Sequence, residues 1–249
     1  MAELGTARDG GVATLTLRRP ERRNAFTGAL HDELRAALDE VAADAEVRAV
    51  VLTGEGKGFC AGQDLADPEV AVGADLGGAV ERWNGLVRAL RDLPQPVVAA
   101  VNGVAAGAGA NLAFACDLVV AARSARFLQP FAQLGLVPDT GGTWTLPRLV
   151  GPQRAAGLCL LGEPLGAEDA QRAGLVWQVV DDGEVVAAAT AIAARLAALP
   201  PQGLRATKRA LSASLANDLD TQLDLERDLQ RAAGAGAEYR DAVTAFLAR

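Results

Sequence analysis

The sequence predicts an α/β fold in which a body of strands and helices is followed by a helical region. Two observations predict this class. Short apolar strand patterns alternate with helical patterns up to about residue 182, and strand patterns stop beyond Gly183. The 249 residues, half of them hydrophobic, supply ample surface for a buried core. We therefore expect a core over residues 1–182 that holds the functional site, and a helical oligomerisation region over residues 183–249.

The first hundred residues alternate strands with helices. Val12–Leu17 alternates apolar and polar residues, as a half-buried strand does. Thr27 is placed to cap the next helix, because its hydroxyl can accept a hydrogen bond from the first turn. Buried strands are expected at Val47–Thr53 and Val97–Val101. The two helices between these three strands carry apolar residues at helical spacing, namely Leu30, Leu34, Leu38 and Val41, then Val80, Trp83, Leu86, Val87 and Leu90.

The remaining elements follow from turn residues and apolar runs. A glycine-rich turn and a helix near Gly109–Ala115 lead into a strand over Asp117–Ala122. Phe127–Trp144 is irregular and rich in Pro and Gly. The next elements are helices near Pro152–Leu161 and Ala167–Ala173 and a strand at Val176–Val180. Breaks near Pro200, Asn217 and Gly234 divide the final region into helices.

Composition excludes several kinds of site. His31 is the only histidine, which excludes a His-rich metal site, and its helical surroundings indicate a solvated or helix-end residue. Cys60, Cys116 and Cys159 are odd in number and widely spaced, which indicates a reducing compartment such as the cytoplasm. A net charge of −7 argues against nucleic-acid binding. The start lacks a secretory pattern, and polar residues and glycines interrupt the apolar stretch Val97–Ala122, so we expect no membrane span.

Three segments do not resemble ordinary core: GKGFCAGQDL, NGVAAGAGANL and GLVPDTGGTWTLPR. Each places glycine-rich backbone beside an expected helix start. Glycine lets backbone N–H groups approach a ligand closely, and a helix start favours developing negative charge. Tight connections between buried strands would give the same pattern. Phosphate-binding loops of the GxxxxGK[ST] or full GxGxxG type are absent from the sequence.

Taken together, these segments resemble the crotonase family of enoyl-CoA hydratases and isomerases. The resemblance is carried by GFCAGQDL, AVNGVAAGAGANLAFACDLVVAA and GLVPDTGGTWTLPRLVG, and extends from RPERRNAF to AFLAR. It implies a spiral of strand-strand-helix turns with a C-terminal helical trimerisation part. The expected assembly is therefore a homotrimer, or a hexamer made of two trimers.

The resemblance also implies an oxyanion hole, a pair of backbone N–H groups that holds the thioester oxygen. By motif position these amides belong to Gln63 and Ala108. Removing a proton next to a thioester carbonyl builds negative charge on its oxygen, and preorganised donors stabilise that charge by about 3–4 kcal/mol each. An ordinary loop glutamine and helix-start alanine are the alternative interpretation.

A single acid stands where the family's isomerases carry one. Hydratases of the family use two glutamates, and the matching positions here hold Asn111 and Phe131, neither of which can act as a base. Asp139 remains, although Pro-Asp-x-Gly is also common turn chemistry. Apolar neighbours should desolvate Asp139 and raise its pKa, which improves it as a base. These neighbours are Phe131, Leu136, Val137 and Trp144.

The substrate implied by the resemblance is an acyl-CoA thioester, with CoA as part of the substrate and no separate cofactor or metal. The residues that match the family's substrate- and CoA-binding segments are Arg22, Arg23, Ala61, Asp64, Leu65, Phe131, Phe246 and Arg249. The two arginines are equally explained as solvated surface residues, and Asp64 as a helix cap. Cys60 lacks an activating partner in the sequence and is interpreted as a small buried residue.

The activity implied is isomerisation, and the third motif is most similar to family members that convert the ring-1,2-epoxide of phenylacetyl-CoA to an oxepin thioester. A shift of a 3-enoyl double bond to the 2 position uses the same groups. A straight-chain Δ3,Δ2-enoyl-CoA isomerase, an enoyl-CoA hydratase that uses other residues, and a non-catalytic acyl-CoA- or RNA-binding relative remain as alternatives.

Overall fold

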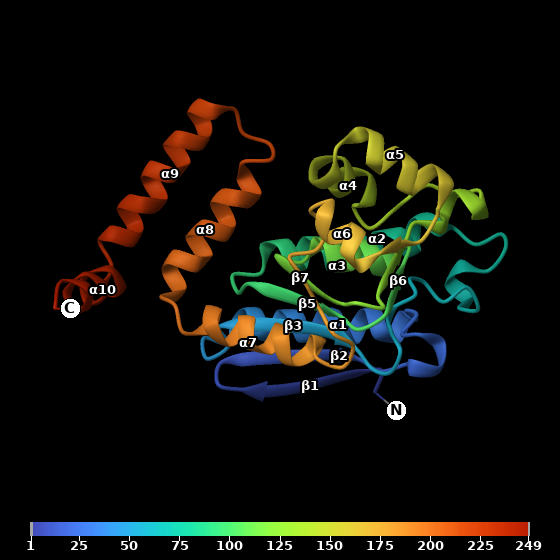
Figure 1. Cartoon of the computed structure of the whole chain (residues 1–249), viewed down its shortest axis with the longest axis horizontal. Helices are drawn as coiled ribbons and strands as arrows, with labels where there is room; N and C mark the ends of the chain where they lie inside the picture. The colour runs from blue at the N-terminus through green and yellow to red at the C-terminus, as the bar shows by residue number, and fades with distance from the viewer. Residues whose placement is uncertain (1, 249) are drawn as a thin grey trace.

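The computed structural model describes residues 2–248 and has the predicted α/β body, with three helices that extend away from it as an arm (Figure 1). The main sheet has the order β1-β2-β3-β5-β7-β10. Only β1 is antiparallel to its neighbour, and the other pairs are parallel. Its strands are β1 (Leu4–Asp9), β2 (Val12–Leu17), β3 (Ala49–Gly54), β5 (Val97–Val101), β7 (Leu118–Ala122) and β10 (Gln178–Val180).

A smaller sheet lies beside the main one, with the order β4-β6-β8-β9. Its strands are β4 (Gly58–Cys60), β6 (Val104–Ala106), β8 (Arg126–Leu128) and β9 (Leu165–Gly166). Each of its first three strands follows a main-sheet strand after a short turn, so β3 leads to β4, β5 to β6 and β7 to β8. A helix then returns the chain to the main sheet. This strand-strand-helix repeat is the expected spiral, and it brings the turns after β4 and β6 to one side of the body.

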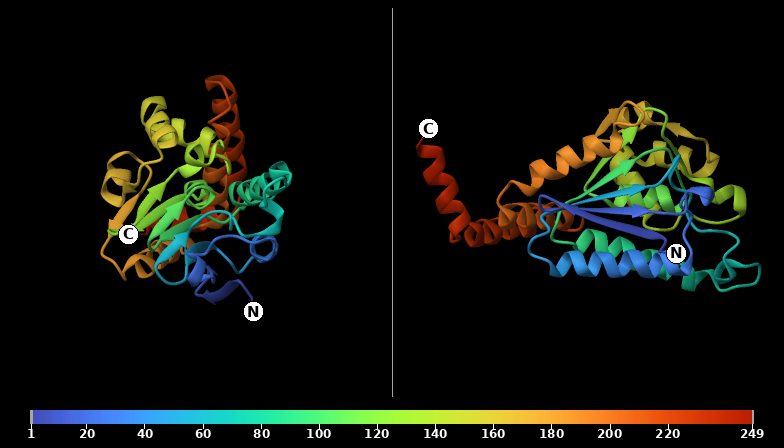
Figure 2. Two further views of the ribbon diagram at one scale, coloured as in Figure 1. Left: turned by 90° about the vertical axis from the view of Figure 1, so that its right-hand side faces the viewer. Right: turned by 90° about the horizontal axis from the view of Figure 1, so that it is seen from below.

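Helices cover both faces of the main sheet (Figures 1 and 2). The helices of the body are α1 (Gly28–Ala43), α2 (Leu76–Asp92), α3 (Ala108–Ala115), α4 (Gly142–Val150), α5 (Pro152–Leu161), α6 (Ala167–Arg172) and α7 (Val185–Ala197). The predicted cap at Thr27 is confirmed, since its side chain accepts a hydrogen bond from the Leu30 N–H at 3.2 Å. Strands β3 and β5 are buried along their whole length, which explains their continuous apolar runs.

The C-terminal helices divide into two groups. Helix α7 packs on the sheet, and its Ala189 and Ala193 are fully buried. The arm begins at Pro201 and consists of α8 (Pro201–Ala213), α9 (Leu219–Gly234) and α10 (Ala237–Leu247), drawn orange to red in Figure 1. Among the described residues, these three helices contain none that is buried. The predicted breaks near residues 200, 217 and 234 are confirmed.

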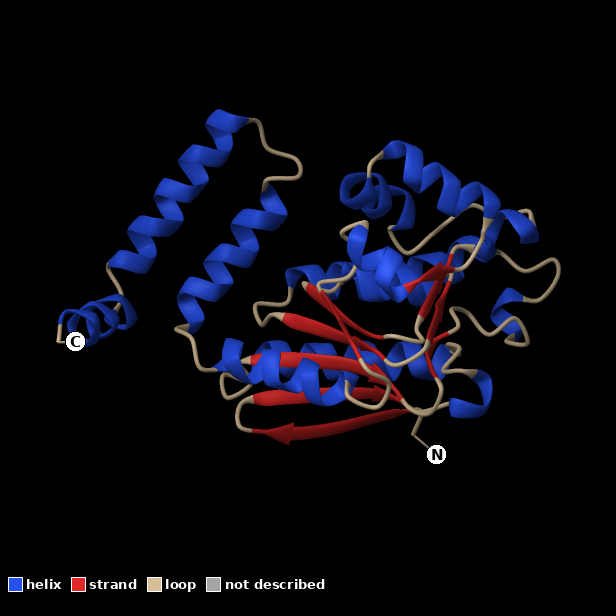
Figure 3. Ribbon diagram, viewed as in Figure 1, coloured by secondary structure: helices blue, strands red, loops and turns tan. Residues whose placement is uncertain are grey.

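One lysine attaches the arm to the body. The Nζ of Lys208 in α8 donates to the backbone carbonyls of Leu90 and Gln95, both at 3.0 Å, and pairs with Asp117 at 2.8 Å. Its side chain is only 9% exposed, so three oxygens replace the water that the ammonium group loses. Figure 3 shows that the arm is entirely helical and stands apart from the strands. Within residues 2–248, no single helix has the length and apolarity to cross a membrane, and the bent pair α7 and α8 meets both criteria only when taken together.

Candidate active site

The three glycine-rich segments meet in space, although they lie far apart in the sequence. A Cβ atom on Gly62, in the turn after β4, would lie 3.0 Å from the Ala106 carbonyl oxygen and 3.4 Å from the Ala108 nitrogen. The turn after β4 is therefore in direct contact with the start of α3. In the third segment, Gly142 touches Asn111 of the same helix. Helix α3 thus brings all three segments to one place.

Two backbone N–H groups at this junction lack acceptors. Among residues 2–248, no oxygen accepts a hydrogen bond from the amide of Gln63 or of Ala108. Hydrogen bonds to Phe26 hold the backbone on both sides of Gln63. Phe26 N–H donates to the Gly62 carbonyl at 2.8 Å, and Asp64 N–H donates to the Phe26 carbonyl at 2.9 Å. Ala108 is the first residue of α3, where the helix dipole adds positive potential. Unpaired amides held in this way are suited to binding an oxyanion.

A side-chain network holds Gln63 from behind. Its Oε1 accepts hydrogen bonds from Trp83 Nε1 at 3.0 Å and from His31 Nε2 at 3.2 Å. Because Oε1 is an acceptor, the Nε2 atom of His31 carries a proton in this hydrogen bond. The His31 ring lies 4.9 Å from that of Phe26 and 4.6 Å from that of Trp83, and the residue is 3% exposed. The prediction of a solvated histidine is therefore wrong, because the neighbouring aromatic rings enclose it, whereas the predicted position at a helix end is confirmed in the first turn of α1.

The enclosed histidine makes the protein sensitive to acid. Burial lowers the pKa of His31 from 6.5 to about 4, although the hydrogen bond to Gln63 opposes this shift. Between these pH values the unfolded chain binds a proton that the folded chain excludes, so stability falls as the pH falls from 6.5 toward 4. The shift corresponds to about 3 kcal/mol.

We therefore expect the substitution His31→Gln, which keeps a donor near Gln63 but cannot titrate, to remove most of this loss. Denaturant unfolding at pH 7 and pH 4.5, at one protein concentration, measures it. The unfolding free energy of the variant minus that of the wild type should be larger at pH 4.5 than at pH 7. The same difference at both pH values would contradict the prediction.

Asp139 lies half-buried in the turn before α4. Burial raises the pKa of its carboxyl group, which confirms the predicted direction, and a hydrogen bond from Thr140 acts in the opposite sense. The Thr140 hydroxyl donates to Asp139 Oδ1 at 2.8 Å. Thr140 itself adopts φ 53°, a left-handed conformation that costs a β-branched residue about 1–3 kcal/mol. The turn is thus strained at the residue that fixes the Asp139 carboxyl group.

The apolar surroundings of Asp139 differ in part from those expected. Phe131 is 7% exposed, and its ring lies 3.5 Å from where a Cβ on Gly107 would be, so it forms an apolar wall beside the start of α3. Leu136 and Val137 are instead exposed, at 41% and 77%. Trp144 is half-exposed, and the guanidinium groups of Arg91 and Arg148 stack on its ring. Of the four apolar residues expected around Asp139, only Phe131, in η3 (Pro130–Leu134), is therefore buried.

Asn111 and Gln129 complete the site, and Gln129 was not predicted. Asn111 Nδ2 donates to the Asp139 backbone carbonyl at 2.9 Å, and Gln129 Nε2 donates to Asn111 Oδ1 at 2.8 Å. Both side chains are buried. Asn111 lies one helical turn beyond Ala108 in α3, so the turn that carries Asp139 is bonded to the same end of α3 as the free Ala108 amide. In the sequence, the only signal for Gln129 is its place directly before Pro130 and Phe131.

The segments matched to CoA binding are exposed. Arg22, Arg23 and Leu65 lie on the surface, and Ala61 is half-buried. Leu65 is 66% exposed, which is unusual for a leucine beside a core turn. Asp64 is already engaged, since it accepts a hydrogen bond from the Ala66 N–H at 3.1 Å and pairs with Arg19 at 2.9 Å. These contacts lower its pKa. The roles in CoA binding stay predictions.

Two further predicted features can be placed. Cys60 is fully buried, and burial raises the pKa of its thiol to about 12, in agreement with its interpretation as an inert core residue. Phe246 is 74% exposed on α10, and Figure 1 shows α10 at the far end of the arm, away from α3 and α4. It does not reach the site of its own chain, and Arg249 lies outside the described residues. Among residues 2–248, no three His, Cys, Asp or Glu side chains are grouped to hold a metal ion.

Comparisons with known proteins identify the family of this chain. A family model described as enoyl-CoA hydratase/isomerase matches residues 7–249. The 1,2-epoxyphenylacetyl-CoA isomerase of Escherichia coli is 54% identical over 243 residues, which cover 96% of this chain and 93% of that protein. The 2,3-dehydroadipyl-CoA hydratase of the same organism is 40% identical over 215 residues, covering 86% of this chain and 83% of the relative.

Solved structures match nearly the whole fold. An enoyl-CoA hydratase from Mycobacterium smegmatis superposes with a TM-score of 0.92 at 33% identity, covering 99% of this chain and 96% of that one. One from Polaromonas has a TM-score of 0.92 at 35% identity, with 98% and 96% covered. These structures confirm the expected crotonase spiral. The chain belongs to the enoyl-CoA hydratase/isomerase family.

Proposed function

We propose that the protein is an acyl-CoA isomerase that converts ring-1,2-epoxyphenylacetyl-CoA to the oxepin thioester. The observation that carries the proposal is a half-buried carboxyl group of raised pKa, Asp139, whose backbone carbonyl accepts a hydrogen bond from Asn111, one turn along α3 from the unpaired amide of Ala108. Asn111 and Phe131 supply no second carboxylate. The 54% identity to an isomerase of this name supports the choice of substrate.

The proposed mechanism moves one proton. The amides of Gln63 and Ala108 receive the thioester oxygen and stabilise the enolate that forms when Asp139 removes a proton from the adjacent carbon. Asp139 then returns this proton to the carbon two bonds further along the conjugated system. In the ring epoxide, the carbon–carbon bond shared by the two rings breaks to give the seven-membered oxepin, and the same proton transfer completes the product. A 3-enoyl thioester becomes a 2-enoyl thioester by the identical transfer. The substrate carries the CoA, and the proposed reaction uses no other cofactor.

A panel of three substrates tests the proposal. We expect turnover of the ring-epoxide thioester and of a straight-chain 3-enoyl-CoA, with the higher kcat/KM for the ring epoxide. We expect little 3-hydroxybutyryl-CoA from crotonyl-CoA, since Asn111 is committed to the Asp139 carbonyl and Phe131 is apolar. Product analysis by mass spectrometry distinguishes the three outcomes. Hydration of crotonyl-CoA as the fastest reaction would favour the second candidate, a hydratase, which the relationship to a dehydroadipyl-CoA hydratase keeps open.

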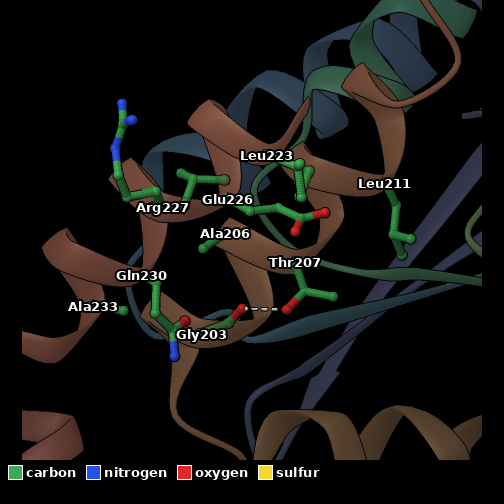
Figure 4. Close-up of a pocket in the computed structure, with 11 residues that line it drawn as sticks. Gly203, Ala206, Thr207, Leu211, Leu223, Glu226, Arg227, Gln230 and Ala233 are labelled. Carbon is green, nitrogen blue, oxygen red and sulfur yellow. Dashed lines mark hydrogen bonds between the residues drawn. The ribbon is translucent and has the colours of Figure 1, made fainter. Parts of the chain in front are cut away.

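Assembly into a homotrimer, or a hexamer of two trimers, is part of the same proposal. The arm exposes large apolar side chains that a monomer would leave in water: Leu211, Leu215, Leu219, Leu223, Tyr239, Phe246 and Leu247. Figure 4 shows Leu211 and Leu223 at a groove between α8 and α9. In this groove the Thr207 hydroxyl donates a hydrogen bond to the Gly203 carbonyl. We place this assembly in the cytoplasm, where buried free thiols such as Cys60 stay reduced. Sedimentation equilibrium tests the assembly, and a stable monomer would contradict it.

A further inference from the structure

Two buried amide side chains connect the core to the turn that carries Asp139. Asn111 in α3 is 2% exposed, and Gln129, which directly precedes η3, is 3% exposed. They form a chain in which Gln129 Nε2 donates to Asn111 Oδ1 at 2.8 Å and Asn111 Nδ2 donates to the Asp139 carbonyl at 2.9 Å. A buried polar side chain has a high desolvation cost, so two of them hydrogen-bonded to each other indicate a specific structural role.

The Asp139 carbonyl, at the end of this series of hydrogen bonds, fixes the orientation of both amide groups. A backbone carbonyl can only accept hydrogen bonds, so the amide nitrogen of Asn111 must face Asp139. The Asn111 oxygen then faces Gln129, which must present its own nitrogen. Neither amide can turn over without placing two like groups against each other. The two residues therefore hold one arrangement.

This arrangement fixes the peptide plane that follows Asp139. The Asp139 carbonyl accepts from Asn111 and also from the Gly142 N–H at 2.8 Å, which occupies both of its lone pairs. With that plane fixed, Thr140 is held at φ 53° and its hydroxyl reaches Asp139 Oδ1 at 2.8 Å. The buried amides are thus connected, through one carbonyl and one strained residue, to the carboxyl group itself.

The packing around Asn111 supports the same conclusion. A Cβ atom on Gly142 would overlap the Asn111 amide, so the first residue of α4 must be glycine for the turn to approach this closely. The left-handed conformation of Thr140 is unfavourable for a β-branched side chain and persists only where surrounding contacts impose it. Asn111 and Gly142 supply such contacts.

We propose that Asn111 and Gln129 are positioning residues, which hold Asp139 in the orientation needed for proton transfer without touching the substrate. The inference rests on the proposed role of Asp139. It also gives a reason for an asparagine at the position where hydratases of the family have a glutamate: in this chain the side chain organises the base instead of activating water.

Three single substitutions test the proposal: Asn111→Ala, Gln129→Ala and, as a matched control, Gln95→Ala. Gln95 is equally buried, at 2% exposure, and donates to the Val41 and Val47 carbonyls on the side of the sheet covered by α1. We expect Asn111→Ala to lower kcat by about 10- to 100-fold with KM nearly unchanged, because a misdirected base slows the proton transfer and leaves CoA binding intact. Gln95→Ala should lose a similar amount of stability and keep its kcat.

The pH profile supplies a readout that a loss of stability does not move. In the wild type, the hydrogen bond from the Thr140 hydroxyl to Asp139 Oδ1 lowers the pKa of the carboxyl group. When the hydrogen bonds from Asn111 and Gln129 are removed, we expect this bond to be lost. The acid limb of kcat/KM should therefore shift to higher pH in Asn111→Ala and Gln129→Ala, and stay in place in Gln95→Ala. The double variant Asn111→Ala, Gln129→Ala should show the kcat of Asn111→Ala alone, because Gln129 acts only through Asn111.

The outcomes separate this proposal from the one it rests on. If Asp139→Asn is inactive while Asn111→Ala and Gln129→Ala keep the wild-type kcat and acid limb, the positioning role is wrong and the proton shuttle stands. If Asp139→Asn is active, the proposed function is wrong, whatever the amide variants do. If Asn111→Ala does not fold, Gln129→Ala decides, since an unchanged kcat and acid limb in that variant would overturn the proposal.

Discussion

Replacing Asp139 with Asn is expected to lower kcat by about 10²- to 10⁴-fold, the usual contribution of a general acid–base group. The variant keeps the size of the side chain and an oxygen that can accept from the Thr140 hydroxyl, and it loses only the ability to take and return a proton. Binding of a CoA thioester should be nearly unchanged. Steady-state rates on a 3-enoyl-CoA and calorimetric titration with a saturated acyl-CoA measure the two effects separately.

The same substitution is expected to stabilise the fold at neutral pH. Burial raises the pKa of Asp139, so the folded state holds the carboxyl proton more tightly than the unfolded state does. The stability that this proton contributes is fully present below the unfolded pKa and is lost as the pH rises through the folded pKa. Above the folded pKa, the wild type therefore carries a half-buried negative charge that Asp139→Asn lacks. Thermal unfolding should give a higher Tm for the variant at pH 7, with the gap closing in acid. A lower Tm at pH 7, or full activity, would contradict the assignment.

The substitution Gly109→Ala is expected to reduce kcat/KM by about 10²- to 10³-fold, as the loss of one oxyanion donor does. Its new Cβ would overlap the Cys60 carbonyl oxygen and lie 2.7 Å from the Cys60 sulfur. The turn after β4 and the start of α3 cannot both keep their places, and these segments carry the two free amides. Overpacking of this kind also costs about 1–3 kcal/mol of stability.

A matched substitution separates the clash from a general effect of alanine. Gly157 lies in the middle of α5 with nothing within 4 Å of where its Cβ would be. Gly157→Ala should leave kcat/KM unchanged and raise the unfolding free energy by about 0.5–1 kcal/mol, because alanine favours a helix over glycine. Kinetics and thermal unfolding of both variants provide the comparison. Wild-type kcat/KM in Gly109→Ala would show that this contact does not position the amides.

Elements with a strong periodic pattern or a recognisable cap were predictable. The alternation of β2, the cap at Thr27 and the breaks at residues 200, 217 and 234 are all confirmed, since each depends on local chemistry. Strand β1 was missed because it is an exposed edge strand with a polar sequence. The smaller sheet was missed because its strands have two or three residues, too few for any period to show.

Within the site, the sequence identified the residues that belong to recognisable motifs. It missed the residues whose position depends on packing between distant parts of the chain. The glycine-rich turns were found because the motifs place them beside helix starts, and Asp139 was found through the resemblance to the family. The burial of His31 depends on rings contributed by Phe26 and Trp83, from other parts of the chain. The contact of Asn111 with a carbonyl 28 residues away likewise depends on how α3 and α4 meet. Long-range contacts of this kind leave no periodic signal.

The strands of the main sheet stand side by side in the order in which the ribosome delivers them, from β1 at one edge to β10 at the other. Each newly made strand therefore extends an existing edge, and none has to insert between two that are already paired. Loop closure then joins only neighbours along the nascent polypeptide, which limits its entropic cost at every step. The arm emerges last, so the proposed contact between copies would begin only when the sheet behind it is complete.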